Sequence, residues 1–263
     1  DAMPDVPLAT LGKGIFTKEL EVALLQGRID MAVHSLKDLP VELAEGLSIV
    51  VVCQRQDPRD VLVNKANCPL SEMEPGAVIG TSSPRRLAQL YALRSDLRVE
   101  PIRGNVETRL NKALGQDYDG VVLAAAGIAR LGFQGRIAHY FDLSEMGPEP
   151  GQGALAVEVR SENKALLDLL SQMEDPQTTT AIAAERAFVE RMGGGCKVPI
   201  AAHAWVEGNT LRMVGMVASE NGHQMVKTRL ESTTEQPRAA GNALAEKLLS
   251  LGAADILKAG ASS

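Results

Sequence analysis

The sequence predicts an α/β protein with two lobes and a cleft between them, followed by a smaller α+β domain. Apolar strand patterns alternate with amphipathic helix patterns over residues 60–131, as in α/β layer domains. Two polar or Pro/Gly-rich stretches, 54–60 and 146–153, interrupt this pattern and are expected to be crossovers between the lobes. From about residue 175 the pattern changes to one long helix and strands separated by short turns.

Apolar periodicity and turn residues predict the elements in chain order. The first helix has Phe16 and Leu20 on one face, and the strand over 47–53 is apolar throughout, which is typical of a strand in a mixed or parallel sheet. Gly208-Asn209 and Asn221-Gly222 are hairpin turn pairs. The expected helices cover residues 13–26, 84–94, 105–115, 125–131, 162–172, 178–192, 235–250 and 253–259. The expected strands cover residues 30–34, 47–53, 60–63, 77–80, 98–102, 119–124, 154–160, 198–206, 210–218 and 224–230.

The crossovers divide these elements into three domains. We expect domain 1 to comprise residues 1–54 and 151–173, domain 2 to comprise 58–147, and domain 3 to comprise 175–263. Domain 2 is then an α/β lobe inserted into domain 1, and domain 3 is the small α+β unit. A ligand is expected in the cleft between the first two domains.

Composition excludes several classes of partner. The chain has 263 residues, a net charge of −6 and only 3% aromatic residues, so it is a poor binder of nucleic acid and of anionic membranes. No apolar run reaches the roughly 18 residues of a transmembrane helix. Cys53, Cys68 and Cys196 have neither CxxC nor zinc spacing, so we expect no metal site and a reducing, cytoplasmic compartment.

Arginine and hydroxyl side chains gather at two strand-to-helix junctions. At the first, Ser83 suits the N-cap and Pro84 the first helical position; at the second, Asn105 suits the N-cap. Helix N-termini bind anions, and open α/β sheets bind ligands at the carboxyl ends of their strands. The junctions could therefore bind a polycarboxylate, or they could be only helix caps and solvated arginines. The residues concerned are Thr81, Ser82, Ser83, Arg85, Arg86, Arg103, Gly104 and Arg109.

A second candidate is the segment from His34 to Pro40, at the end of a strand. Lys37 and Asp38 place an ammonium beside a carboxylate, which in a cleft could stabilise a cation or move a proton. The alternative is a surface ion pair. His34 by itself is expected to be a hydrogen-bonded core histidine.

A third candidate is the thiol of Cys196. Gly193, Gly194 and Gly195 leave its surroundings without side chains, and Lys197 favours the thiolate. The alternative is a helix stop followed by a buried small residue, and the composition does not decide between them. Cys53 and Cys68 are expected to be structural.

Seven motifs together resemble the hydroxymethylbilane synthase family, also called porphobilinogen deaminase. They keep the order and approximate spacing of that family over nearly the whole chain. The motifs are GKGIFTKELE (12–21), DMAVHSLKDLP (30–40), GTSSPRR (80–86), IRGNVETRL (102–110), GIARLG (127–132), GQGALAVE (151–158) and GGCKVPI (194–200).

The resemblance implies two lobes like those of periplasmic binding proteins plus a small α+β C-terminal domain. It implies a transferase that condenses four porphobilinogen units into hydroxymethylbilane, with loss of ammonia, in heme and other tetrapyrrole biosynthesis. The growing chain is held on a dipyrromethane cofactor bound covalently to Cys196. The implied enzyme is a cytoplasmic monomer with a small-molecule substrate and no metal.

The resemblance also assigns roles to residues. Asp38 is the central carboxylate that holds pyrrole N–H groups and stabilises the cationic azafulvene, with Lys37 and Lys13 as basic catalytic residues of the cleft. The cofactor-binding positions are Cys196, Asp38, Thr81, Ser82, Ser83, Arg85, Arg86, Arg103 and Gly104. The substrate-binding positions are Phe16, Arg109, Arg130 and Gln152.

The chain starts just before the GKGIF motif. The family begins with a βαβ unit whose first strand carries an R-x-S-x-L-A motif, and this unit has no counterpart here. The chain begins with Asp1 rather than Met, and we expect it to start within a longer protein and to be inactive in this form. Two alternatives remain: a non-catalytic two-lobed module that binds a small anion, and a cysteine acyltransferase or hydrolase with His203 as its base.

Overall fold

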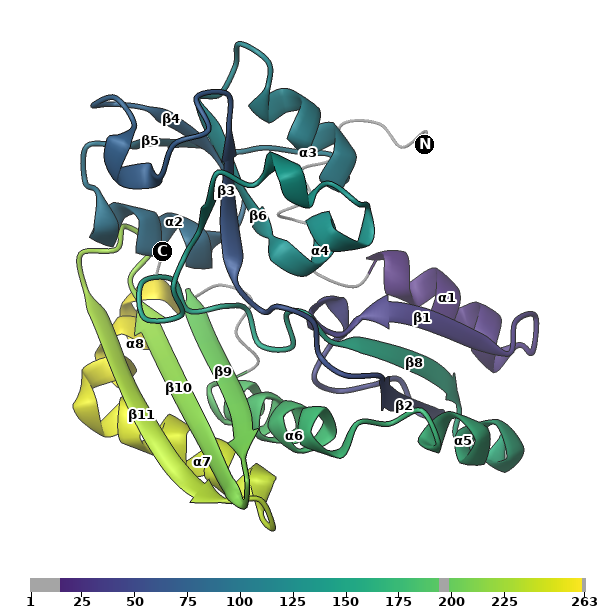
Figure 1. The fold of residues 1–263 in the computed structure, drawn as a ribbon. Coiled ribbons are helices and arrows are strands. Elements are labelled where there is room, and N and C mark those ends of the chain that lie inside the picture. Colours follow the sequence, from purple (N-terminus) through teal and green to yellow (C-terminus); the bar gives the residue numbers. More distant parts are fainter. Residues whose placement is uncertain (1–14, 194–198, 262–263) are drawn as a thin grey trace.

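The computed structural model describes residues 15–193 and 199–261. Its strands form three sheets, in the orders β1-β8-β2, β5-β4-β6-β3-β7 and β11-β10-β9. Figure 1 shows the five-stranded sheet and its helices as an upper lobe, the β1-β8-β2 sheet as a second lobe, and the β9–β11 sheet with its helices below. The fold is therefore two α/β lobes with a C-terminal α+β unit, as predicted.

The first lobe is split in sequence around the second. Its elements are α1 (Ile15–Leu25), β1 (Met31–Ser35), the 3₁₀ turn η1 (Leu36–Asp38), β2 (Leu47–Val52), β8 (Leu155–Arg160) and α5 (Lys164–Ser171). β8 lies between β1 and β2 and is antiparallel to both. The expectation of a mixed or parallel environment for residues 47–53 is wrong within the described strands. The returning chain enters the sheet at the carboxyl ends of both neighbours, where Leu155 pairs with Ser35 and with Val52.

The second lobe alternates strands and helices as expected. Its elements are β3 (Asp60–Asn64), η2 (Leu70–Glu72), β4 (Val78–Gly80), α2 (Pro84–Leu93), β5 (Arg98–Glu100), α3 (Val106–Ala113), β6 (Gly120–Ala124), α4 (Ala125–Arg130), η3 (Gln134–Arg136) and β7 (His139–Tyr140). β4 is parallel to β5 and β6, whereas β3 is antiparallel to β6 and β7. Separate apolar clusters around Ile128 and Leu90 bury strand side chains of this sheet. The elements η2, η3 and β7 were not predicted because two or three residues carry no periodic signal.

The third unit is an antiparallel sheet packed against helices. Its elements are α6 (Pro176–Arg191), β9 (Ile200–Glu207), β10 (Thr210–Ala218), β11 (Met225–Thr233), α7 (Pro237–Leu248), the π turn η4 (Leu249–Ala253) and α8 (Ala254–Ala261). Phe188 and Leu244 are fully buried in its core. Gly208 and Gly222 have positive φ in the two hairpins, which confirms the predicted turns. The domain boundaries drawn from the sequence stay a prediction.

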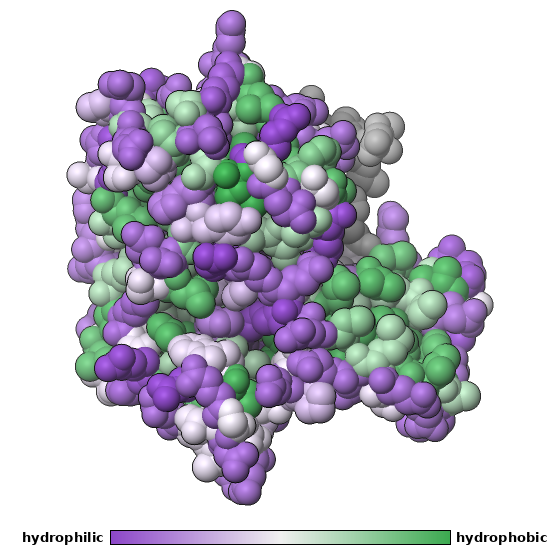
Figure 2. Space-filling model, viewed as in Figure 1, coloured by the Kyte–Doolittle hydropathy of each residue, from purple (hydrophilic) through white to green (hydrophobic). Residues whose placement is uncertain are grey.

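The two crossovers lie side by side where the three units meet. The backbone N–H of Gln56 donates to the carbonyl of Gly153 over 3.1 Å. A Cβ on Gly153, whose φ is +91°, would lie 2.4 Å from the Gln56 carbonyl oxygen, so only glycine fits there. Hydrophilic residues cover the central surface of the molecule, while apolar residues are exposed on the lobe of β1 (Figure 2). A buried polar network occupies this junction.

Candidate active site at the junction of the lobes

The carboxylate of Asp60 is the centre of a buried polar network. Asp60 is the first residue of β3 and is fully buried. Its Oδ2 accepts from Arg85 Nη1 at 2.7 Å, and its Oδ1 accepts from Arg86 Nε and Nη2 at 3.1 and 2.7 Å. Burial raises the pKa of Asp60, but the two guanidiniums outweigh it and hold that pKa well below its ordinary 3.8. Two cations against one anion leave a net positive charge at this point.

Arg85 and Arg86 are therefore neither solvated nor simply aimed into a cleft. They are only 4% and 6% exposed, and they belong to the first turn of α2. Arg85 also donates to the carbonyl of Gly147 at 2.6 Å, and Arg86 to that of Val122 at 3.1 Å. Nε and Nη2 of Arg85 are buried and have no hydrogen-bond partner among the described residues.

Gln152 connects Asp60 to Lys37 across the two lobes. Its Nε2 donates to Asp60 Oδ1 at 2.9 Å and to the Pro58 carbonyl at 2.7 Å. Its Oε1 accepts from Lys37 Nζ at 3.2 Å. Burial and the nearby charge of Arg86 lower the pKa of Lys37 from 10.5 to about 8, against the opposing effects of Asp38 and Asp60. The ammonium of Lys37 can thus exchange a proton near neutral pH.

Asp38 and Arg109 approach this network from opposite lobes. Asp38 ends η1 and is exposed, whereas Arg109 lies in α3 and is half-buried. Burial and the charge of Arg86 lower the pKa of Arg109, while the charge of Asp38 raises it. Arg109 Nε donates to the Gly104 carbonyl at 2.8 Å. Asp38, Lys37, Arg86 and Arg109 are therefore within electrostatic range of one another.

Arg130, at the end of α4, reaches from the second lobe to the first. Its Nη2 donates to the Gly153 carbonyl at 3.2 Å, and its Nη1 lies 3.5 Å from Ser35 Oγ. Burial lowers the pKa of Arg130. The guanidinium is therefore close to the end of β1, where Lys37 and Asp38 follow.

The two strand-to-helix junctions have the caps that were predicted. Ser83 Oγ accepts from the backbone N–H of Arg86, and Asn105 Oδ1 accepts from that of Thr108. Ser82 Oγ joins the junctions by donating to the Ile102 carbonyl at 2.7 Å and accepting from its N–H at 3.0 Å. The buried hydroxyl of Thr81 accepts from the Ser83 N–H at 3.2 Å. Arg103 is exposed, and Gly104 has a φ of +118°.

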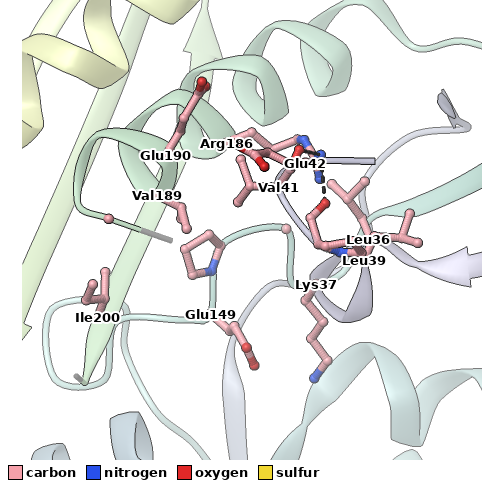
Figure 3. Close-up of a pocket in the computed structure, with 14 residues that line it drawn as sticks. Leu36, Lys37, Leu39, Val41, Glu42, Glu149, Arg186, Val189, Glu190 and Ile200 are labelled. Atoms are coloured by element: carbon pink, nitrogen blue, oxygen red, sulfur yellow. Dashed lines mark hydrogen bonds between the residues drawn. The ribbon is translucent and has the colours of Figure 1, made fainter. Parts of the chain in front are cut away.

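A pocket of about 670 Å³ lies between the first lobe and α6. Arg186 Nη2 donates to the carbonyls of Pro40 and Val41 at 2.9 and 2.6 Å, which ties α6 to the segment that follows Asp38. Figure 3 shows Lys37 at this pocket, with its ammonium pointing away from Arg186. The lining includes Lys37, Pro40, Glu149, Arg186, Gly193 and Ile200. Gly193 and Ile200 are described residues on either side of the segment that contains Cys196.

A second buried carboxylate, Glu185 of α6, joins the third unit to both crossovers. It accepts from Arg55 Nη1 at 2.6 Å and Nη2 at 3.2 Å, and from the backbone N–H groups of Gly151 at 2.6 Å and Ala204 at 2.7 Å. Arg55 Nε also donates to the Gln152 carbonyl at 2.8 Å. Gln152 is therefore held at two points: its side-chain amide contacts Asp60, and its backbone carbonyl accepts from Arg55.

Some residues singled out in the sequence lie outside the described residues, and one of the others, Cys53, differs from the expectation. Lys13 and Cys196 lie outside the described residues, and Phe16 is described only as part of the α1 backbone. Cys53 was expected to be a structural residue within a strand, but β2 ends at Val52 and Cys53 is exposed with a φ of +63°. His34 is 8% exposed with Nε2 3.1 Å from Glu158 Oε2, as expected of a core histidine.

Sequence reasoning missed Asp60, Arg55 and Glu185. Asp60 is a charged residue at the start of an apolar strand, and Glu185 lies among alanines on the buried face of a helix. A charged residue in an apolar context signals a buried ionic partner. Among the described residues no group of three His, Cys, Asp or Glu could hold a metal ion, and no helix there is long and apolar enough to cross a membrane.

The family models and the curated relatives agree with one another over almost the whole chain. Residues 1–168 match the family model for the dipyromethane cofactor binding domain of porphobilinogen deaminase, and residues 179–250 match that for its C-terminal domain. The porphobilinogen deaminase of Pelotomaculum thermopropionicum is 48% identical over 98% of this chain and 83% of its own length. That of Geobacillus kaustophilus is 49% identical over 98% of this chain and 84% of its own length. A nutrient-binding protein from Burkholderia cenocepacia bound to methionine has a TM-score of 0.40 and 14% identity over 66% of this chain and 80% of its own.

Proposed function

The chain belongs to the porphobilinogen deaminase family, and from this premise we propose how its own residues carry the reaction of the family. The enzyme joins porphobilinogen units head to tail into hydroxymethylbilane and releases ammonia, a step of tetrapyrrole biosynthesis. Its cofactor is dipyrromethane. The observation that carries the proposal is the convergence of Lys37 and Asp38 from one lobe with Arg86 and Arg109 from the other.

The donor set at the junction fits a dipyrromethane. Each pyrrole of the cofactor carries carboxylate side chains, and a chain of net charge −6 can attract them only through a local cluster of cations. Asp60 with Arg85 and Arg86 supplies one net positive charge, next to Lys37 and Arg109. Guanidinium–carboxylate contacts contribute about 1.5–3 kcal/mol each.

We assign the contacts as follows. The positions that hold the cofactor are Asp38, Thr81, Ser82, Ser83, Arg85, Arg86, Arg103 and Gly104, with Cys196 as the point of attachment. We propose Arg109, Arg130, Gln152 and Phe16 as substrate contacts, and Lys13 as a basic catalytic residue. When bound, the dipyrromethane supplies the pyrrole carbon to which the next unit is joined.

Lys37 and Asp38 have complementary roles at the reacting carbon. The carbon–nitrogen bond of the substrate aminomethyl group breaks with both electrons leaving on nitrogen, so the amine must be protonated to depart as ammonia. The ammonium of Lys37, with its pKa near 8, holds a proton that it can supply to that amine. The carbon left behind becomes positively charged, and the exposed carboxylate of Asp38 stabilises that charge.

Intact-mass measurement of the protein purified from cells tests the assignment of Cys196. We expect a mass above that of the bare polypeptide by one dipyrromethane, and the loss of this increment in the Cys196→Ser variant. Cys53→Ser is the matched control, because Cys53 is an exposed free thiol, and it should retain the increment. A catalytically active preparation whose mass equals that of the polypeptide would refute covalent attachment.

We propose further that the protein acts as a monomer in the cytoplasm. The thiols of Cys53 and Cys68 are free, as in a reducing compartment. Sedimentation equilibrium should give the mass of one chain, and a dimer mass at micromolar concentration would contradict the monomer.

A further inference from the structure

We infer that Asp60 is a positioning residue of the deaminase site, whose buried carboxylate orients Gln152 and two guanidiniums and, through Gln152, places the ammonium of Lys37. The inference rests on the proposed role of Lys37 as a proton donor. Asp60 lies at the end of the first crossover, and Gln152 lies in the second. The hydrogen bond between them therefore joins the two crossovers.

The hydrogen bonds of Gln152 admit only one orientation of its amide. Both partners of Nε2, the carboxylate of Asp60 and the carbonyl of Pro58, can only accept hydrogen bonds. Lys37 can only donate, so it requires the amide oxygen. A flipped amide would direct an NH₂ group at the ammonium and an oxygen at the carboxylate. The carboxylate of Asp60, together with the carbonyl of Pro58, therefore holds the oxygen of Gln152 toward Lys37.

Asp60 also fixes the start of α2. Its two oxygens accept three hydrogen bonds from Arg85 and Arg86, which occupy the first turn of that helix. Both guanidiniums lie in the interior, where an unpaired charge is costly. Asp60 thus holds in place the cations that face Lys37.

The charges around Lys37 predict in which direction its titration moves when position 60 loses its charge. Arg86 and Arg85 disfavour its protonated form, while Asp38 and Asp60 favour it. An uncharged residue at position 60 removes one favourable anion and leaves both arginines uncompensated. Lys37 should then lose its proton at a lower pH. A purely structural role for Asp60 would lower the amount of folded protein without moving this titration.

The experiment compares Asp60→Asn with the parent holoenzyme. Two quantities are measured against pH: kcat/KM for porphobilinogen, and the rate at which acetic anhydride acylates Lys37, followed by peptide mass spectrometry. We expect the alkaline limb of kcat/KM and the labelling midpoint to move together by roughly one unit toward lower pH. Asp96→Asn is the control, because Asp96 is an exposed carboxylate paired with Arg94, and it should leave both profiles unchanged. An Asp60→Asn holoenzyme with parental profiles overturns the inference.

A second variant covers the case in which Asp60→Asn does not fold. Gln152→Met leaves the pairs of Asp60 with the arginines intact but removes the acceptor for Lys37. We expect a smaller shift of the labelling midpoint in the same direction, and a parental midpoint overturns the inference. Labelling of Lys37 does not depend on catalysis. A parent protein that carries no cofactor would refute the proposed function, but the labelling would still test the position of Lys37.

Discussion

Removal of the Glu185 carboxylate should detach the third unit from the crossovers. In Glu185→Ala, Arg55 keeps its charge in a setting where only 9% of its side chain is exposed. The backbone N–H groups of Gly151 and Ala204 lose their acceptor as well. Breaking a buried ion pair from one side costs about 3–5 kcal/mol, and a buried unpaired donor costs about 1–3 kcal/mol. Because these contributions overlap, we expect a loss of about 5 kcal/mol in the free energy of unfolding.

Urea denaturation followed by tryptophan fluorescence measures this loss. Trp205 is the single tryptophan, and it stacks on His203 at 5.4 Å beside Ala204, so it reports on the strand that Glu185 contacts. The control is Glu246→Ala, which breaks an exposed ion pair with Arg191 and should cost less than about 1 kcal/mol. A Glu185→Ala transition within 1 kcal/mol of the parent would refute the reasoning.

The same carboxylate predicts an acid dependence. Burial raises the pKa of Glu185, but the charge of Arg55 and the contact with His203 outweigh it and lower that pKa from 4.5 to about 2. A depressed pKa in the folded state contributes stability that is complete above pH 4.5 and is lost as the pH falls toward 2. The parent should therefore lose stability over this interval, and Glu185→Ala should lose less.

Three further changes separate packing from chemistry. Gly153→Ala should destabilise the protein by at least about 1–3 kcal/mol, because its Cβ would overlap the Gln56 carbonyl at a positive φ. Gly132 also has a positive φ but has open space around it, so Gly132→Ala should cost less in the same urea titration. Asp38→Asn should lower kcat by about 100-fold or more with an unchanged urea midpoint, and near-parental turnover would rule out its proposed role. Arg109→Gln should raise the KM for porphobilinogen about tenfold, the equivalent of about 1.4 kcal/mol, and steady-state kinetics with an unchanged KM would exclude a contact with substrate.

Local structure was predictable where a few neighbouring residues decide it. Ser83 and Asn105 cap their helices as expected because each bonds a backbone N–H three residues ahead. The direction of β2 was not predictable, because its apolar pattern is equally compatible with a parallel neighbour. Its antiparallel pairing depends on where the chain returns from the second lobe, which is a matter of topology.

The sequence by itself determined the order of the elements, their caps and turns, and, through motifs spread over the chain, the family and its reaction. Only the tertiary structure decided what the charged residues do at the junction. Arg85 meets Asp60 across 25 residues, Gln152 meets it across 92, and Arg55 meets Glu185 across 130. No local pattern encodes such pairs, because they exist only after packing has brought distant segments together and excluded water from them. An arginine that suits an anion site in the sequence can therefore be a buried partner of aspartate in the fold.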